Sequence, residues 1–140
     1  MNKPFSASAA AAVALLCGGP TSATEVACHY VYGGEEHVLT AAAVASPYAV
    51  PAIAVGSYFE LRVVFQDAPA TVAAVHVYTY AAHGGERSLV HEASYRYPPT
   101  RDAGEPYGFT GRQLVYEPVL GSELEYWCVV PAAQKVAAQR

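Results

Sequence analysis

The sequence predicts an all-β fold, a β-sandwich of antiparallel sheets with about seven short strands and one disulfide. Apolar and polar residues alternate with a period of two along most of the chain beyond residue 24, whereas helical periodicity is hard to find. Tyr and Val, which favour strands, are abundant, and Gly and Pro interrupt the apolar runs at short intervals. Many short strands with regular turn signals are typical of a sandwich or a barrel, and the 140 residues suffice for one domain.

The first residues are typical of a secretory signal peptide. Lys3 supplies a short positive segment, residues 7–17 form an apolar run in which Ser8 is the one polar residue, and the small residues 21–23 precede Thr24. The apolar run has 11 residues, which is shorter than the ~20 residues that a helix needs to cross a bilayer. We therefore expect cleavage after Ala23.

This expectation divides the chain into three segments. Residues 1–23 form the signal peptide, residues 24–131 the β-sandwich domain and residues 132–140 a flexible C-terminal tail. Cys17 is not expected to carry a lipid, because Leu16 precedes it where a lipoprotein signal has a small residue. Arg is preferred to Lys, and Ala, Gly, Pro and Val are abundant, which indicates a GC-rich bacterial gene. The predicted location is periplasmic or secreted.

Cys28 and Cys128 are the two cysteines that remain after cleavage, one near each end of the domain. An even number of cysteines in an exported protein predicts a disulfide. Closing a loop of about 100 residues stabilises a fold by up to ~4.7 kcal/mol in the chain-entropy model. Two buried free thiols are the alternative, and a cysteine-based metal site is disfavoured because the sequence has no C-x-x-C pair.

The expected strands lie between Gly- and Pro-rich turns. Residues 58–65 form the clearest one, because Phe59 and Leu61 begin an apolar face that alternates with a largely polar one. Two prolines restrict residues 46–56 to an edge strand or an extended crossing. The remaining strands are expected at residues 25–32, 37–44, 71–82, 87–97, 112–119 and 123–130.

Gly84 and Gly85 predict a two-residue hairpin turn, in which both residues need a positive φ angle. This turn sets Tyr78 opposite His91 and places His76 diagonally from His91 on the same face, about 7–8 Å away at the backbone. Three further tyrosines are assigned to that face, Tyr80, Tyr95 and Tyr97. The cluster is a candidate copper or zinc site with His76, His91 and Tyr78 as ligands. A hydrogen-bonded aromatic face is the alternative, and a slip of one residue in register would separate the two histidines.

Near the C-terminus, Tyr126 lies two residues before Cys128, after the acidic stretch at residues 122–125. This spacing resembles that of immunoglobulin-like domains, in which a Tyr lies two residues before a core Cys on a late strand. The resemblance implies an immunoglobulin-like sandwich as an analogy of architecture alone. It departs from the antibody pattern, because Cys28 lies on the first strand and the only Trp, Trp127, stands beside the second cysteine.

Side chains at alternate positions of the last expected strand, residues 123–130, point to opposite faces of the sheet. If Cys128 points into the core, Trp127 and Glu125 point outward. A disulfide to Cys28 would bring His29 close to Trp127. We therefore predict a partner-binding patch of Trp127, His29 and Glu125, because exposed aromatic residues are enriched at interfaces. The alternative is that the long loop at residues 98–108, or the C-terminal tail, covers Trp127.

Charge and motifs disfavour several classes of function. The net charge is −4, and loss of Lys3 with the signal peptide gives −4 − 1 = −5, so a nucleic-acid partner is not expected. No Ser lies in a G-x-S-x-G turn and no Gly-rich phosphate loop opens a helix, so we expect neither an enzyme nor a bound organic cofactor. The 11 tyrosines favour a recognition surface, although strand formation explains them equally well.

The sequence therefore predicts an exported, non-catalytic binding or accessory protein. Its partner would be another periplasmic or secreted protein, or a ligand, recognised through a sheet face that carries Tyr and Trp. The alternative function is that of a small periplasmic metal-binding protein, which would hold copper or zinc in the cross-strand His/Tyr cluster. No transmembrane segment is expected in the mature chain.

Overall fold

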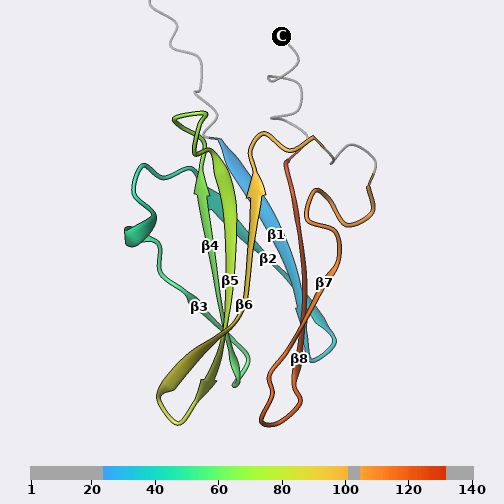
Figure 1. Cartoon of the computed structure of the whole chain (residues 1–140). Helices are drawn as coiled ribbons and strands as arrows, with labels where there is room; N and C mark the ends of the chain where they lie inside the picture. Colours follow the sequence, from blue (N-terminus) through green and yellow to red (C-terminus); the bar gives the residue numbers. More distant parts are fainter. Residues whose placement is uncertain (1–23, 101–104, 132–140) are drawn as a thin grey trace, which may run out of the picture.

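The computed structural model describes residues 24–100 and 105–131, which form two antiparallel sheets of four strands each (Figure 1). Sheet A has the strand order β2-β1-β8-β7, and sheet B has the order β3-β4-β5-β6. The strands of sheet A are β1 (Glu25–Tyr32), β2 (Glu35–Ala42), β7 (Gln113–Tyr116) and β8 (Glu123–Val129). Those of sheet B are β3 (Ile53–Val55), β4 (Phe59–Gln66), β5 (Ala74–His83) and β6 (Glu86–Arg96). The expected signal peptide and C-terminal tail lie outside the described residues.

The predicted all-β sandwich is confirmed, and the described residues form eight strands in place of about seven. The short strand β3 comes from the proline-containing stretch at residues 46–56 and lies at the edge of sheet B, where a strand beside prolines is tolerated. A 3-10 helix, Pro47–Ala49, precedes it. In the part of the chain that the structure describes, no helix is long and apolar enough to span a membrane.

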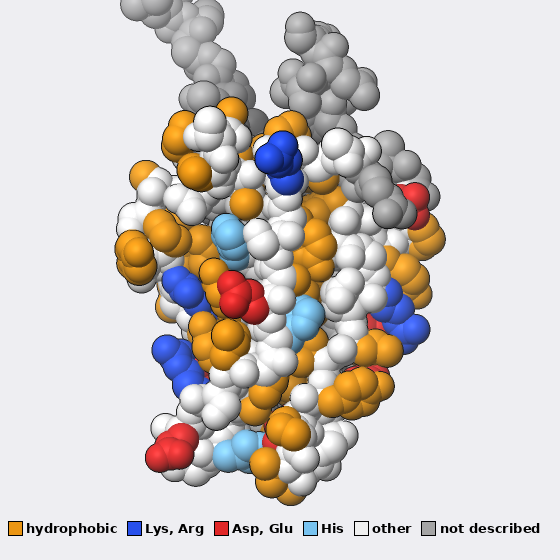
Figure 2. Space-filling view, viewed as in Figure 1, with side chains coloured by type: hydrophobic (Ala, Val, Ile, Leu, Met, Phe, Trp, Pro, Cys, Tyr) orange, Lys and Arg blue, Asp and Glu red, His pale blue; other side chains and the backbone are white. Residues whose placement is uncertain are grey.

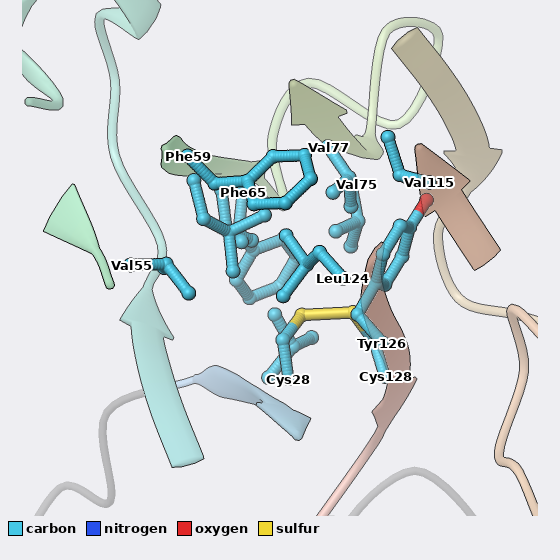
Figure 3. Packing of buried hydrophobic residues seen from close by; sticks show 13 residues of the cluster. Cys28, Val55, Phe59, Phe65, Val75, Val77, Val115, Leu124, Tyr126 and Cys128 are labelled. Carbon is cyan, nitrogen blue, oxygen red and sulfur yellow. A yellow bond between two sulfur atoms is a disulfide. The ribbon is translucent and has the colours of Figure 1, made fainter. Parts of the chain in front are cut away.

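The core lies between the sheets and is built by alternate residues of each strand, as the period of two requires. On β4, Phe59, Leu61, Val63 and Phe65 are at most 3% exposed. Facing residues of sheet A and of β5 complete the cluster, as Figure 3 shows around the disulfide; they include Val26, Val75, Val77, Val115, Leu124 and Tyr126. Burial of each such side chain contributes roughly 1.5–3 kcal/mol to folding.

The predicted disulfide between Cys28 and Cys128 is confirmed. The two cysteines are directly opposite each other in the register of β1 and β8, with Cα atoms 4.0 Å apart, and both are fully buried. The bond therefore links the two central strands of one sheet. An antibody-type disulfide instead joins the two sheets across the core, so the likeness to immunoglobulin-like domains stops at the sandwich architecture.

Two diglycine turns set the hairpins. Gly33-Gly34 joins β1 to β2 and Gly84-Gly85 joins β5 to β6, and all four glycines have positive φ angles. The predicted register of the second hairpin holds from His83 to Tyr80 and is wrong beyond it. A bulge between Thr79 and Tyr80 shifts the pairing by one residue, because Tyr80 pairs with Leu89 whereas Thr79 pairs with His91.

Candidate functional site

The candidate site is the outer face of sheet A, on the side away from the core. Leu124, Tyr126 and Cys128 of β8 are buried, so Glu125 and Trp127 point outward, as the sequence predicts. On the neighbouring β1, the burial of Cys28 turns His29 outward in the same way. The disulfide therefore lies immediately beneath the site.

His29 and Trp127 form the centre of this face. They are direct partners in the register of β1 and β8, one residue away from the disulfide pair. Their rings stack with centroids 5.2 Å apart and planes inclined by 7°. The sequence-based expectation that His29 lies near Trp127 therefore agrees with the register. Side chains directly opposite each other in a sheet are close enough for such contact, and the disulfide holds the two strands in register.

A carboxylate lies beside each of the two rings. Glu36 is paired with His29, and Glu125, beside Trp127, is paired with Arg112. Glu36 of β2 lies 2.8 Å from the Nδ1 atom of His29. Arg112 donates two hydrogen bonds to Glu125, of 2.6 and 2.7 Å, in the bidentate geometry of a guanidinium–carboxylate pair. The hydrogen bonds from Arg112 lower the pKa of the Glu125 carboxyl, which keeps it ionised beside Trp127.

The loop before β7 partly covers Trp127. Tyr107 contacts the indole edge-on, with ring centroids 5.4 Å apart, and the Arg112 guanidinium lies 5.9 Å from the Tyr107 ring centroid. Phe109 N–H donates to the Cys128 carbonyl, and the Cys128 N–H donates to the Thr110 hydroxyl, so the loop is fastened to β8. The alternative expectation, that a loop shields Trp127, is thus correct in part, and the tail that could also shield it lies outside the described residues.

Two large, exposed side chains of β7 extend the face beyond Trp127. Leu114 and Tyr116 of β7 are 43% and 57% exposed and lie opposite Glu125 and Glu123 in the strand register. The face is therefore a strip of half-buried and exposed aromatic and apolar groups, bordered by carboxylates whose positions are fixed by His29 and Arg112. Such a composition suits the centre and rim of a recognition surface.

The predicted His/Tyr cluster is not brought together. The bulge sets His91 opposite the fully buried Thr79, whereas His76 and Tyr78 belong to the outer face of sheet B and pair with Ser94 and Glu92. His76 and His91 consequently face opposite sides of the sheet, and the predicted pairing of Tyr78 with His91 is wrong. Two of the tyrosines that were assigned to the same face as His76, Tyr95 and Tyr97, pack against the core instead. Among the described residues, no group of three or more His, Cys, Asp and Glu side chains could hold a metal ion.

His91 has a different partner, which sequence reasoning missed. Its Nε2 atom lies 2.8 Å from the Tyr126 hydroxyl, which reaches it across the core from sheet A. Burial lowers the pKa of His91 and raises that of Tyr126. A second missed contact joins His83 to Glu117, which is fully buried. In the sequence, Glu117 is marked only as the one charged residue of the stretch 114–120, and nothing local marks its partner.

Charged side chains are scattered on the face of the molecule that Figure 2 shows, with acidic, basic and His groups set among apolar ones. No family model, curated protein or solved structure matches this chain. The assignment of a function therefore rests on the site itself.

Proposed function

We propose that the protein is an exported, non-catalytic binding or accessory protein that recognises a protein partner through the outer face of sheet A. The observation that carries this proposal is the parallel stack of His29 on Trp127, which stands on the disulfide-linked strand pair. Rigid aromatic side chains give large contact areas at a low entropic cost, and they are enriched at binding hot spots.

The surroundings of the stack support recognition. Arg112 and Glu125 hold each other in one geometry and so lose little freedom when a partner arrives. Leu114 and Tyr116 offer apolar area next to them. The disulfide supports an oxidising compartment, which agrees with the signal peptide expected from the sequence. A periplasmic or secreted partner is therefore the one that this surface would meet.

Site-specific photo-crosslinking tests this proposal. Benzoylphenylalanine is placed at Leu114 on the outer face of sheet A, and in a matched variant at Leu89, which is 50% exposed on β6 of sheet B. Each purified variant is irradiated in an extract of exported proteins, and adducts are identified by mass spectrometry. We expect one defined adduct from position 114 that position 89 does not give.

The captured protein is then purified and titrated against the unmodified chain, with the fluorescence of Trp127, the only Trp, as the reporter. Trp127→Ala removes this reporter, so its binding is measured with a fluorescent label on the partner. The variant should bind at least tenfold more weakly, as expected for a hot-spot aromatic residue. Leu89→Ala serves as the control. Equal adducts from positions 114 and 89, or unchanged affinity in Trp127→Ala, would refute the proposed face.

A further inference from the structure

A second binding feature lies at the opposite edge of sheet A, along β2. The sandwich has four edge strands, and three of them are unsuited to pairing with another chain. β3 has 3 residues, β7 has 4 residues, and the register of β6 is interrupted by the bulge opposite Thr79 and Tyr80. Short or bulged edges are the devices by which sheets avoid further pairing.

β2 lacks these devices. It has 8 residues, and all of them, from Glu35 to Ala42, pair with β1 without a register shift. In the described part of the chain, β1 is the only strand that pairs with it, which leaves its other edge open. Its apolar half is unprotected by charge, because the only acidic residues of the strand, Glu35 and Glu36, lie together at its first end. Such an edge is a template for an added strand.

An apolar groove of about 330 Å³ runs beside this open edge. Leu39 and Ala41 of β2 form one wall, Val50 and Ile53 form the opposite wall, and Val63 lies at its base. Leu39 and Ala41 are paired with Cys28 and Val26, so they share the inward side of the sheet. A strand added to β2 would point every second side chain to that same side, which is where the groove lies.

The far wall is held in place. The Arg62 guanidinium donates hydrogen bonds to the carbonyls of Val50, at 2.8 Å, and of Pro47. At one end of the groove, Val44 N–H donates to the Phe65 carbonyl and ties the chain just after β2 to sheet B. Figure 1 shows the segment between β2 and β3 leaving the sandwich on this side. The groove is therefore formed before any ligand arrives, which lowers the cost of binding.

We propose that β2 and this groove bind an extended peptide segment of a partner protein by strand addition. The peptide would carry small or β-branched apolar side chains at alternate positions, and a Lys or Arg at the end that meets Glu35. The main chain would pair with β2, and the apolar side chains would enter the groove between Leu39 and Ile53. This site does not use Trp127, so it stands apart from the function proposed above.

Charge favours a cationic peptide over a second copy of the chain. The side chain of Glu35 is 81% exposed, and its nearest basic group is His37 at 3.8 Å. β2 contains no Lys or Arg. Two copies that paired antiparallel through β2 would set the acidic end of each strand against the alanine-rich end of the other, so neither Glu35 would gain a cation. A peptide with a terminal Lys or Arg would supply one.

Fluorescence anisotropy tests the proposal with the full chain and a labelled peptide, Lys-Arg followed by four Val-Thr repeats. Ala49→Trp narrows the groove at an exposed position, and Ala54→Trp is the matched control, exposed on β3 outside the groove. We expect saturable binding that Ala49→Trp weakens at least tenfold and that Ala54→Trp and Trp127→Ala leave unchanged. Glu35→Gln should weaken it roughly two- to threefold at low salt only.

Peptides N-methylated at every second residue, in both phases, separate strand pairing from simple apolar contact. One phase should abolish binding and the other should retain it, because alternate residues of a strand direct their N–H groups to opposite edges. Equal binding of both phases, or absence of saturable binding by the unmodified peptide, would overturn the proposal.

Benzoylphenylalanine at position 49 identifies the occupant directly. A crosslink to the added peptide supports the proposal. A crosslink to a second copy of the chain, or to residues 1–23 of the same chain, would mean that the groove already has another occupant, and this would overturn it. The peptide assays do not depend on Trp127. A negative result in them would therefore leave the function proposed for the outer face of sheet A untouched.

Discussion

The Nε2 atom of His83 lies 2.7 Å from Oε1 of Glu117, whose side chain is fully shielded from solvent. His83 ends β5, and Glu117 opens the loop between β7 and β8, so the contact connects a hairpin of sheet B to one of sheet A. Glu117 also accepts hydrogen bonds of 2.6 Å from the N–H groups of Val119 and Leu120. Burial acts to raise the pKa of Glu117, but these two amides and His83 outweigh it and leave the pKa below its ordinary value.

Replacing this carboxylate should loosen the β7–β8 hairpin. Glu117→Gln keeps the size of the side chain but can accept only one of the two backbone N–H groups well, and it loses the charge that His83 meets. We expect the melting temperature to fall by roughly 5 °C or more, as measured by circular dichroism. Glu123→Gln is the control, because Glu123 is exposed on β8. A fall of equal size in both variants would contradict a special role for Glu117.

The lowered pKa of Glu117 also predicts an acid limb of stability. A carboxyl that titrates lower in the folded chain than in the unfolded one stabilises the fold above its ordinary pKa of about 4.3. This stabilisation should disappear as the pH falls from that value through the folded-state pKa. Urea unfolding at pH 7, 5, 4 and 3 measures the effect. The loss below pH 5 should be smaller in Glu117→Gln, and parallel curves for the two proteins would contradict this assignment.

His91 predicts a second pH dependence at higher pH. Burial lowers its pKa from 6.5, so the unfolded chain binds the proton more readily. The contribution of His91 to the free energy of unfolding is therefore fully present above pH 6.5, and it declines as the pH falls below that value. The slope should stay below the ~1.4 kcal/mol per pH unit of one full proton, because the imidazole is only half-buried. The NMR titration of the His91 ring measures the pKa, and His91→Gln should remove this limb while His37→Gln, on exposed β2, should not.

The disulfide predicts a large difference between oxidised and reduced protein. It closes a sequence separation of 100 residues, and loss of such a bond typically costs 2–5 kcal/mol. The variant Cys28→Ser/Cys128→Ser should unfold at a correspondingly lower urea concentration. Alkylation of the exported protein, unfolded in urea without reductant so that buried thiols are accessible, should label neither cysteine. Labelling of both would show that the bond is absent from the native protein.

Position 108 is expected to accept no residue larger than Gly. Its φ angle is +59°, and a Cβ atom there would lie 2.0 Å from the Cys128 carbonyl oxygen. Gly111 has a similar φ angle of +67°, but a Cβ atom there would meet nothing within 4 Å. Gly111→Ala should therefore cost about 1 kcal/mol from backbone strain alone, and Gly108→Ala should cost more, because it also pushes the loop away from β8. The emission of Trp127 should shift in Gly108→Ala only, since Tyr107 moves with that loop.

Much of the fold could be predicted from local patterns. The alternation in residues 58–65 identified the strand β4 and its buried face, and the diglycine at residues 84 and 85 identified the hairpin turn. The pairing of the two cysteines followed from their number, and the parity of β8 then set Trp127 outward. These features depend on neighbours in the sequence, or on a count of residues, and so require no knowledge of the packing.

The sequence-based predictions were wrong, or missed a contact, where the packing of residues far apart in the chain decides the structure. The bulge that separates His76 from His91 has no signal in residues 79–91. Its unpaired residue, Val90, packs against the core, and such packing is set by the tertiary structure. It turns His91 inward to the hydroxyl of Tyr126, 35 residues away. The contact between His83 and Glu117 is likewise made by two hairpins of different sheets.

The sequence by itself determined the β-sandwich class, the disulfide and the outward direction of Trp127, because period and turn chemistry are local properties and the number of cysteines requires only a count. Only the tertiary structure decided which partners the polar groups find: the stack of His29 on Trp127, the two buried polar contacts of His91 and Glu117, and the open edge of β2 beside its groove. Those features depend on the register of strands and on the approach of two sheets, and one inserted residue in a strand is enough to turn a side chain from one face to the other.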